Sequence, residues 1–321
     1  MTQKTMTMRD ALIQRIYQRM GEDEKVVFLA ADLGAPKLDA LRRDFPDRFF
    51  NVGIAEQNLI NVSVGFALEG YTVFCYAIAA FLTMRAYEQI RNNIALLSSS
   101  KELNINMIGL GVGLSYDVSG PSHHCLEDIV VIRNLPNIMF LSPADSVATE
   151  TMADYSFEVK KPKYLRLDGK PLPVIYGQSR PLDMDKGFSE IITGGSVCIV
   201  ASGYMTHRAM AAAELLKHEG IKAGVIDVFR LKPQPSDGFI EALEKYDHII
   251  TLEEGFIGKG GLDILVLTMM QGKKQPITRM GFGDNYVFNI GSRDYLHKLC
   301  RLDPQSVAER ARFLVNGGDI R

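Results

Sequence analysis

Short β-rich runs alternate with helix-length segments along the whole chain of 321 residues. The expected strands are, in chain order, Val26–Ala31, Thr72–Ile78, Asn104–Leu110, Ile138–Leu141, Tyr164–Leu167, Val197–Ala201, Ala223–Val228, His248–Leu252 and Ile277–Gly281. Helical periodicity predicts helices between them, among them Met84–Leu97 and His207–His218, the latter followed by Gly220 as a stop signal. Strands that alternate with helices form mostly parallel sheets that helices cover on both faces. We therefore expect an α/β protein.

The segment 170–187 interrupts this rhythm, because prolines and glycines replace the periodic pattern there. It is typical of a linker between domains. We expect two doubly wound α/β domains with mostly parallel sheets, residues 1–180 and 188–321, joined by a linker at about 170–187.

Charge and cysteine usage narrow the function classes. A net charge of −2 gives no electrostatic argument for binding nucleic acid or an anionic membrane. No secretory signal or membrane-spanning stretch is apparent, and the four cysteines are scattered without a CxxC pair. We expect reduced thiols and a cytoplasmic protein. Cys125 beside His123 and His124 raises a thiol nucleophile or a metal cluster as an alternative, but no further ligand lies nearby at a plausible spacing.

The segment FNVGIAEQN, residues 50–58, places one acidic side chain, Glu56, in a run of apolar and small residues. It leads from a strand-like segment, Arg48–Val52, into a helix-like segment, Gln57–Leu68, that is apolar nearly all round. Such a helix is buried. A carboxyl at the mouth of a buried helix is costly to ionise and suits a site where a nitrogen heterocycle must be protonated. The alternative is that Glu56 only caps its helix.

Further motifs follow in a fixed order. They are FLTMRAYEQ at 81–89, a glycine-rich stretch at 109–120 that leads into GPSHHCLED at 120–128, LPN at 135–137, SPAD at 142–145 and YLRLDG at 164–169. Together they resemble the C-terminal half of a transketolase, a pyrimidine-binding domain followed by a smaller C-terminal domain. The resemblance covers nearly the whole chain and is greatest to the split transketolases, whose two halves are separate polypeptides.

The resemblance implies a role for several residues at a thiamine diphosphate site. Glu56 matches the glutamate that hydrogen-bonds the aminopyrimidine ring of the cofactor and so promotes its activation. Phe81 and Tyr87 match aromatic residues that pack around that ring, although both also fit an ordinary helix–sheet core. Asp32 matches an acidic residue that lines the site after the first strand. Arg85 has an equivalent in the deoxyxylulose-phosphate synthases, and it is either solvated or functional.

The same resemblance implies substrate contacts. His123 matches a histidine that contacts the substrate, where an imidazole donates to a carbonyl or alkoxide oxygen. His124 has a parallel in related sequences, and Arg166 matches an arginine that binds the substrate phosphate. Ser119 departs from the family pattern, because most relatives have an aspartate there that recognises a sugar hydroxyl. The segment 34–36, Gly-Ala-Pro, also departs from the usual Thr and Ser, so the donor and acceptor sugars stay open.

No GDG motif followed by an asparagine at the family's spacing occurs in the chain. The resemblance therefore implies that the diphosphate and Mg²⁺ are bound mainly by a partner, an N-terminal transketolase subunit with a GDG…N domain. We expect an α₂β₂ complex, no metal ligands in this chain and a role for the C-terminal domain in assembly.

The implied function is transfer of a two-carbon ketol unit from a ketose to an aldose acceptor. Alternatives are the β subunit of a 2-oxo-acid dehydrogenase E1, a carboligase similar to deoxyxylulose-phosphate synthase, and a catalytically silent subunit with an assembly role.

Overall fold

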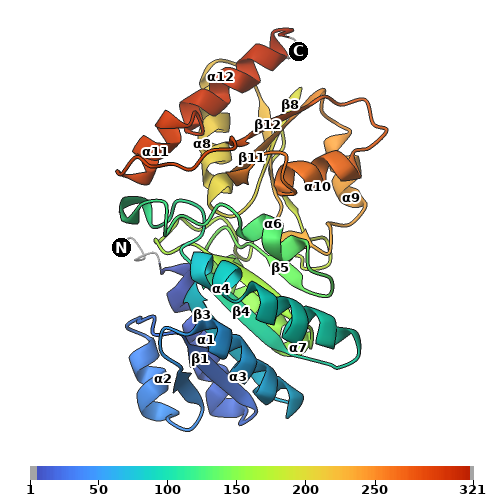
Figure 1. Cartoon of the computed structure of the whole chain (residues 1–321). Coiled ribbons are helices and arrows are strands. Elements are labelled where there is room, and N and C mark those ends of the chain that lie inside the picture. The colour runs from blue at the N-terminus through green and yellow to red at the C-terminus, as the bar shows by residue number, and fades with distance from the viewer. Residues whose placement is uncertain (1–5, 319–321) are drawn as a thin grey trace.

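A computed structural model describes residues 6–318 as two α/β domains (Figure 1). The first contains α1 (Met8–Glu22), β1 (Val26–Ala30), α2 (Leu38–Asp44), β2 (Phe49–Asn51), α3 (Glu56–Leu68), β3 (Thr72–Ile78), α4 (Ala79–Arg85), α5 (Tyr87–Gln89), the π-helix η1 (Ile90–Leu96), the 3-10 turn η2 (Leu97–Ser99), β4 (Ile105–Leu110), the 3-10 turn η3 (Asp117–Ser119), α6 (Asp128–Arg133), β5 (Met139–Leu141), α7 (Ser146–Glu158) and β6 (Lys163–Leu167). The second contains β7 (Ser189–Ile192), β8 (Val197–Ala201), α8 (Tyr204–His218), β9 (Ala223–Asp227), β10 (Arg230–Lys232), α9 (Gly238–Leu243), β11 (His248–Phe256), α10 (Leu262–Met269), β12 (Ile277–Phe282), α11 (Arg293–Leu299) and α12 (Pro304–Val315).

The strands form two sheets that are mostly parallel. The first has seven strands in the order β10-β5-β6-β4-β3-β1-β2, and the second has five in the order β12-β11-β8-β9-β7. Only the outer pairs β10–β5 and β7–β9 are antiparallel. The predicted α/β class is confirmed, and each expected strand is present with ends shifted by a few residues at most.

Successive side chains along a strand point to opposite faces of its sheet. In β1, Phe28 packs with α1, whereas Val27 and Leu29 pack with α3. In β8, Val197 and Ile199 pack with α8 and α12, and Cys198 packs with α9 and α10. Both sheets are therefore covered by helices on both faces, which accounts for their near-continuous apolar strands.

Two expectations need correction. Residues 84–97 do not form one helix, because α4 ends at Arg85, Ala86 leaves the helical region, and the chain then winds as α5 and the π-helix η1. In addition, the strand β10 follows β9 in the chain but pairs with β5 of the first sheet, with Arg230 opposite Leu141. A short piece of the C-terminal half therefore completes the sheet of the N-terminal half.

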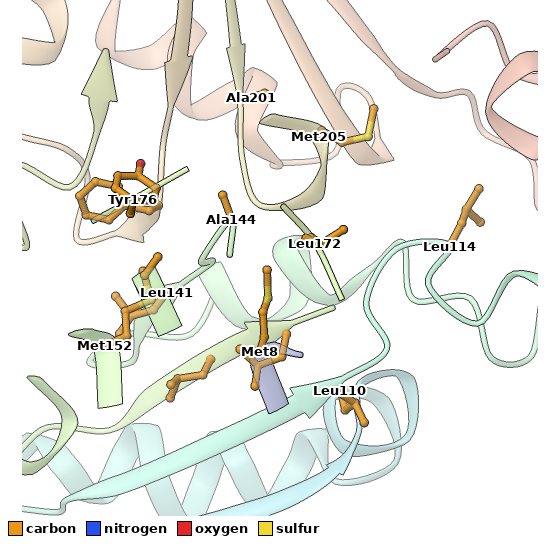
Figure 2. Close-up of a cluster of buried hydrophobic side chains, with 14 of the residues drawn as sticks. Met8, Leu110, Leu114, Leu141, Ala144, Met152, Leu172, Tyr176, Ala201 and Met205 are labelled. Atoms are coloured by element: carbon orange, nitrogen blue, oxygen red, sulfur yellow. The ribbon is translucent and has the colours of Figure 1, made fainter. Parts of the chain in front are cut away.

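One cluster of buried apolar side chains spans both domains. Figure 2 shows Leu141 and Leu172 of the first half together with Ala201 and Met205 of the second in this cluster. Tyr176, from the segment that joins the domains, belongs to it as well. Because apolar burial stabilises such contacts, the two domains are expected to hold one fixed arrangement. In residues 6–318, no helix has the length and apolar character needed to cross a membrane.

Candidate active site

The candidate residues follow the carboxyl ends of neighbouring strands in the first sheet. Asp32 comes after β1, Glu56 after β2, Phe81 after β3 and His123 after β4. These strands are adjacent, in the order β4-β3-β1-β2. Ligands of open α/β sheets bind at this edge. The topology therefore collects residues that lie 24 to 67 positions from Glu56 in sequence, since Asp32 precedes it by 24 and His123 follows it by 67.

Glu56 is the first residue of α3 and only 2% exposed. The N-cap position is Ala55, which provides no side-chain cap, and Gly53 before it has a φ of 78°, a turn that glycine adopts easily. Within the described residues, the recorded partner of the Glu56 carboxylate is a side chain, Arg85, and not a backbone N–H of α3. Glu56 thus lies in the first turn, where the helix dipole favours an acid, but it makes no capping hydrogen bond to the helix.

Arg85 connects Glu56 to an aromatic ring. Its Nη1 donates to Glu56 Oε2 at 2.5 Å, and its guanidinium lies over the Phe81 ring, 4.9 Å from the centroid. Phe81 is half-buried and meets His123 edge to face, with ring centroids 5.3 Å apart. Glu56, Arg85, Phe81 and His123 thus form one continuous chain of contacts. Sequence reasoning left Arg85 undecided, because no periodicity relates it to a residue 29 positions earlier.

His123 and Ser119 lie on the loop between β4 and α6. Gly120, with a φ of 78°, turns the loop, and its carbonyl accepts from the backbone N–H groups of His123 and His124. The Oγ of Ser122 and the Nδ1 of His123 are 3.1 Å apart, which leaves the Nε2 of His123 free of that contact. Ser119 is exposed. The loop therefore presents one imidazole and one neutral hydroxyl at the same edge of the sheet.

Asp32 also lies at this edge and is exposed. It has a φ of 48°, and its backbone N–H and side chain both hydrogen-bond the amide of Asn51, at 3.1 and 3.0 Å. The same Asn51 accepts from the N–H of Gly53. Asp32 thus belongs to the turn that leads to Glu56, in agreement with a lining position.

Three expected site residues have other recorded contacts. Tyr87 is half-buried and packs against a core cluster that includes residues of α3, and the helix is interrupted at Ala86 between it and Phe81. His124 is buried, with its Nε2 3.3 Å from the carbonyl of Asp117, and burial lowers its pKa. His124 is therefore part of the loop interior in this structure.

Arg166 is the third and the clearest correction. Its side chain is 4% exposed, and its Nε donates to Asp128 Oδ2 at 2.9 Å while Nη2 reaches the carbonyl of Glu254 at 3.4 Å. Tyr164 donates to the same Asp128 oxygen at 3.0 Å. A guanidinium enclosed in this way has no open face for a substrate phosphate. The sequence could not show this, because its two partners lie 38 residues before it and 88 after it.

Cysteine and metal chemistry find little support at this edge. Cys125 is fully buried, and burial raises the pKa of its thiol well above the usual value, which is typical of an inert thiol. Within residues 6–318, no three His, Cys, Asp or Glu side chains gather closely enough to hold a metal ion.

The arrangement suits one end of a flat nitrogen heterocycle. The carboxylate of Glu56 can bond a ring nitrogen, the half-buried face of Phe81 can contact the ring, and His123 can donate to an oxygen of a second molecule. The described residues at this edge offer no comparable set of groups for a diphosphate. The geometry is that of half a site.

Family models match two parts of the chain. Residues 4–173 match the pyrimidine-binding domain of transketolase, and residues 190–307 match the C-terminal domain of transketolase. A putative transketolase C-terminal section from Methanocaldococcus jannaschii is 32% identical, over 89% of this chain and 89% of its own length. One of the subunits of the apulose-4-phosphate transketolase of Actinobacillus succinogenes is 30% identical, over 94% and 96% of the two chains. A solved split-gene transketolase, described as an inactive β₄ tetramer, superposes with a TM-score of 0.85 at 30% identity and covers 98% of this chain and 100% of its own.

Proposed function

This chain belongs to the transketolase family, as the C-terminal subunit of a split enzyme, and we propose that with a partner subunit it transfers a two-carbon ketol unit from a ketose to an aldose. The observation that carries the proposal is the placement of Glu56. A carboxylate that is 2% exposed, at the start of a buried helix and paired with an arginine that lies over an aromatic ring, is a costly arrangement for a merely structural residue. It is well suited to a residue that must hold a proton at a ring nitrogen.

Thiamine diphosphate, when bound, supplies the nucleophilic carbon that cleaves the bond next to a ketose carbonyl. The residues of this chain fit its aminopyrimidine end, because Glu56 offers an acceptor for a ring N–H and Phe81 offers an aromatic face. Arg85 donates to Oε2 of that carboxylate, so Oε1 is the oxygen that we propose for the ring N–H. His123 is placed to donate to the carbonyl or hydroxyl oxygen of the sugar.

The other half of the site is proposed to come from an N-terminal subunit with a GDG…N domain, which binds the diphosphate and Mg²⁺. Large apolar side chains on the segments around Glu56 and His123 support an interface there: Ile54 is 75% exposed, and Val118 in η3 and Met84 in α4 are exposed as well. Exposed apolar patches of this kind mark protein–protein contacts. The β₄ tetramer of the solved split-gene relative is described as inactive, which also favours a second type of subunit. We propose an α₂β₂ complex that acts in the cytoplasm, in accordance with the free cysteines.

Two residues leave the identity of the donor and acceptor sugars undecided. The neutral Ser119 stands where most transketolases carry an aspartate, and Pro36 stands close to the position of a phosphate-contacting serine. One relative acts on apulose 4-phosphate, so a phosphorylated or modified sugar is a reasonable first class to screen. Arg166 is left out of the proposed substrate site because it is enclosed.

The matches do not favour the alternatives of an E1 β subunit or a synthase-type carboligase. Release of CO₂ from a 2-oxo acid by the assembled complex would favour the E1 interpretation. A catalytically silent subunit would not need Glu56, Phe81 and His123 to be held in contact through Arg85.

The test of this proposal is turnover by the complex assembled from partner and Glu56→Ala. General acid–base residues contribute on the order of 10²- to 10⁴-fold, so we expect a loss of kcat in that range with the fold retained. Glu69→Ala, at the exposed carboxyl end of the same helix, is the matched control and is expected to keep full turnover. Full activity of Glu56→Ala would refute the proposed role.

A further inference from the structure

A cluster of buried charges joins the two domains directly beneath the loop that carries His123. Its centre is Arg293, the first residue of α11, with Asp168 after β6, Glu254 in β11 and His297 in α11. All four side chains are at most 4% exposed. The cluster contains none of the residues that the family resemblance singled out, and Arg293 and Glu254 belong to the C-terminal domain, for which only assembly was expected.

All three nitrogens of the Arg293 guanidinium group make hydrogen bonds. Nε donates to Glu254 Oε1 at 2.8 Å, Nη2 bonds the other oxygen of Glu254, and Nη1 donates to Asp168 Oδ2 at 2.5 Å. The guanidinium carbon lies 3.4 Å from the centroid of the Tyr204 ring. Burial would raise the pKa of Glu254, but Arg293 and His297 hold it well below its usual range. The fork-shaped cation thus fixes one carboxylate from each domain in a single geometry.

The same residues hold the loop 111–125 at three points. The backbone N–H of Arg293 donates to Asp117 Oδ2 at 2.9 Å, two residues before Ser119. Asp168 accepts from Ser115 Oγ at 3.1 Å. Gly113 packs against the carboxylate of Glu254 so closely that a Cβ would overlap it.

Hydrogen bonds within the loop connect these contacts to the residues next to His123. The carbonyl of Asp117 lies against His124, and Gly113 and Cys125 exchange both backbone hydrogen bonds. The two residues that follow His123 are therefore both tied to parts of the loop that rest on the C-terminal domain.

We infer that Arg293 is a positioning residue, through which the C-terminal domain sets the place of His123 and Ser119 for the substrate. The inference rests on the proposed function for the substrate itself, but the positioning of the loop does not depend on it. An interdomain contact that only added stability would have no reason to reach this loop through the carboxylates of Asp168 and Glu254 and the backbone N–H of Arg293.

The experiment compares Arg293→Met, Arg293→Lys and the control Arg312→Met. Arg312 pairs with Glu219 on the outer side of the same domain, so the control removes an ion pair that does not touch the loop. Hydrogen–deuterium exchange of the full chain is measured for loop 111–125 and for the core strand β8. Steady-state kinetics and cofactor affinity are measured for each variant assembled with the partner.

For Arg293→Met we expect exchange in loop 111–125 to rise by about tenfold or more, with β8 unchanged. We expect KM for the sugar to rise by about tenfold while the Kd of thiamine diphosphate stays the same, because Glu56 and Phe81 lie outside the loop. Arg293→Lys keeps the charge without the fork and should fall between the wild type and Arg293→Met. Arg312→Met should match the wild type.

Unchanged exchange in the loop of Arg293→Met would overturn the inference, and so would faster exchange without a change in KM. The exchange arm needs no substrate, so it decides on the positioning even if the complex lacks transketolase activity. Should Arg293→Met fail to fold, the same comparison is made with Arg293→Lys.

Discussion

At the scale of the single residue, two histidines that are adjacent in sequence differ in exposure and in contacts. His123 is half-buried with its ring against Phe81, whereas His124 is enclosed in the loop, where burial lowers its pKa. The sequence motif shows two adjacent imidazoles but not their difference in exposure. We propose His123 as the one that contacts a substrate.

We therefore expect His123→Asn to lower kcat/KM for the sugar by about tenfold to a hundredfold in the assembled complex, because a donor to a developing oxyanion is lost. The affinity for thiamine diphosphate should not change. Steady-state kinetics and calorimetry measure the two quantities. His218→Asn, at an exposed position of α8, is the control, and an unchanged kcat/KM for His123→Asn would contradict the assignment.

At the scale of the element, the end of β9 is tied to the interdomain segment by a protonated carboxyl. Burial raises the pKa of Asp227 from 3.8 to about 7, although Thr206 and Tyr176 both donate to it at 2.6 Å. Because the folded chain binds this proton more tightly than the unfolded chain, proton binding stabilises the fold. The contribution is fully present below about pH 4 and is lost as the pH rises through about 7.

This pH dependence leads to a prediction for Asp227→Asn, because the amide at that position does not titrate. The free energy of unfolding of the variant, relative to the wild type, should increase between pH 5 and pH 8 by roughly 2.5 kcal/mol. Urea denaturation followed by circular dichroism at both pH values measures it. Other titrating groups are common to both proteins and cancel in the difference. Asp39→Asn, at an exposed position, should show a flat difference, and a flat difference for Asp227→Asn would contradict the account.

The elements themselves were largely predictable, because most central strands are near-continuous apolar runs. The edge strands β7 and β10 were not: β10 is three residues long and pairs with β5 about 90 residues away, so no local pattern marks it. The π-helix η1 was also missed, since a helical stripe of apolar residues does not distinguish a π-helix from an α-helix. At the site, the family motifs led to Glu56, Phe81 and His123. Arg85 and Arg293 act through partners distant in sequence, and the enclosure of Arg166 has the same cause.

At the scale of the whole molecule, the C-terminal domain lies beside the first domain (Figure 1), and Arg293 contacts Asp117 and Asp168 on the segments that follow β4 and β6. One side of the site is therefore built within this chain, by the buried cluster around Arg293. The other side is expected from the partner subunit. On this account neither subunit activates the cofactor by itself.

The most direct test is the rate at which the C2 proton of thiamine diphosphate exchanges for deuterium, followed by NMR. It is measured with this chain alone, the partner alone, the wild-type pair and the pair that carries Glu56→Gln. We predict fast exchange with the wild-type pair only, and slowing on the order of 10²-fold or more in the Glu56→Gln pair. Exchange that is equally fast in the Glu56→Gln pair, or with either subunit alone, would contradict the central claim.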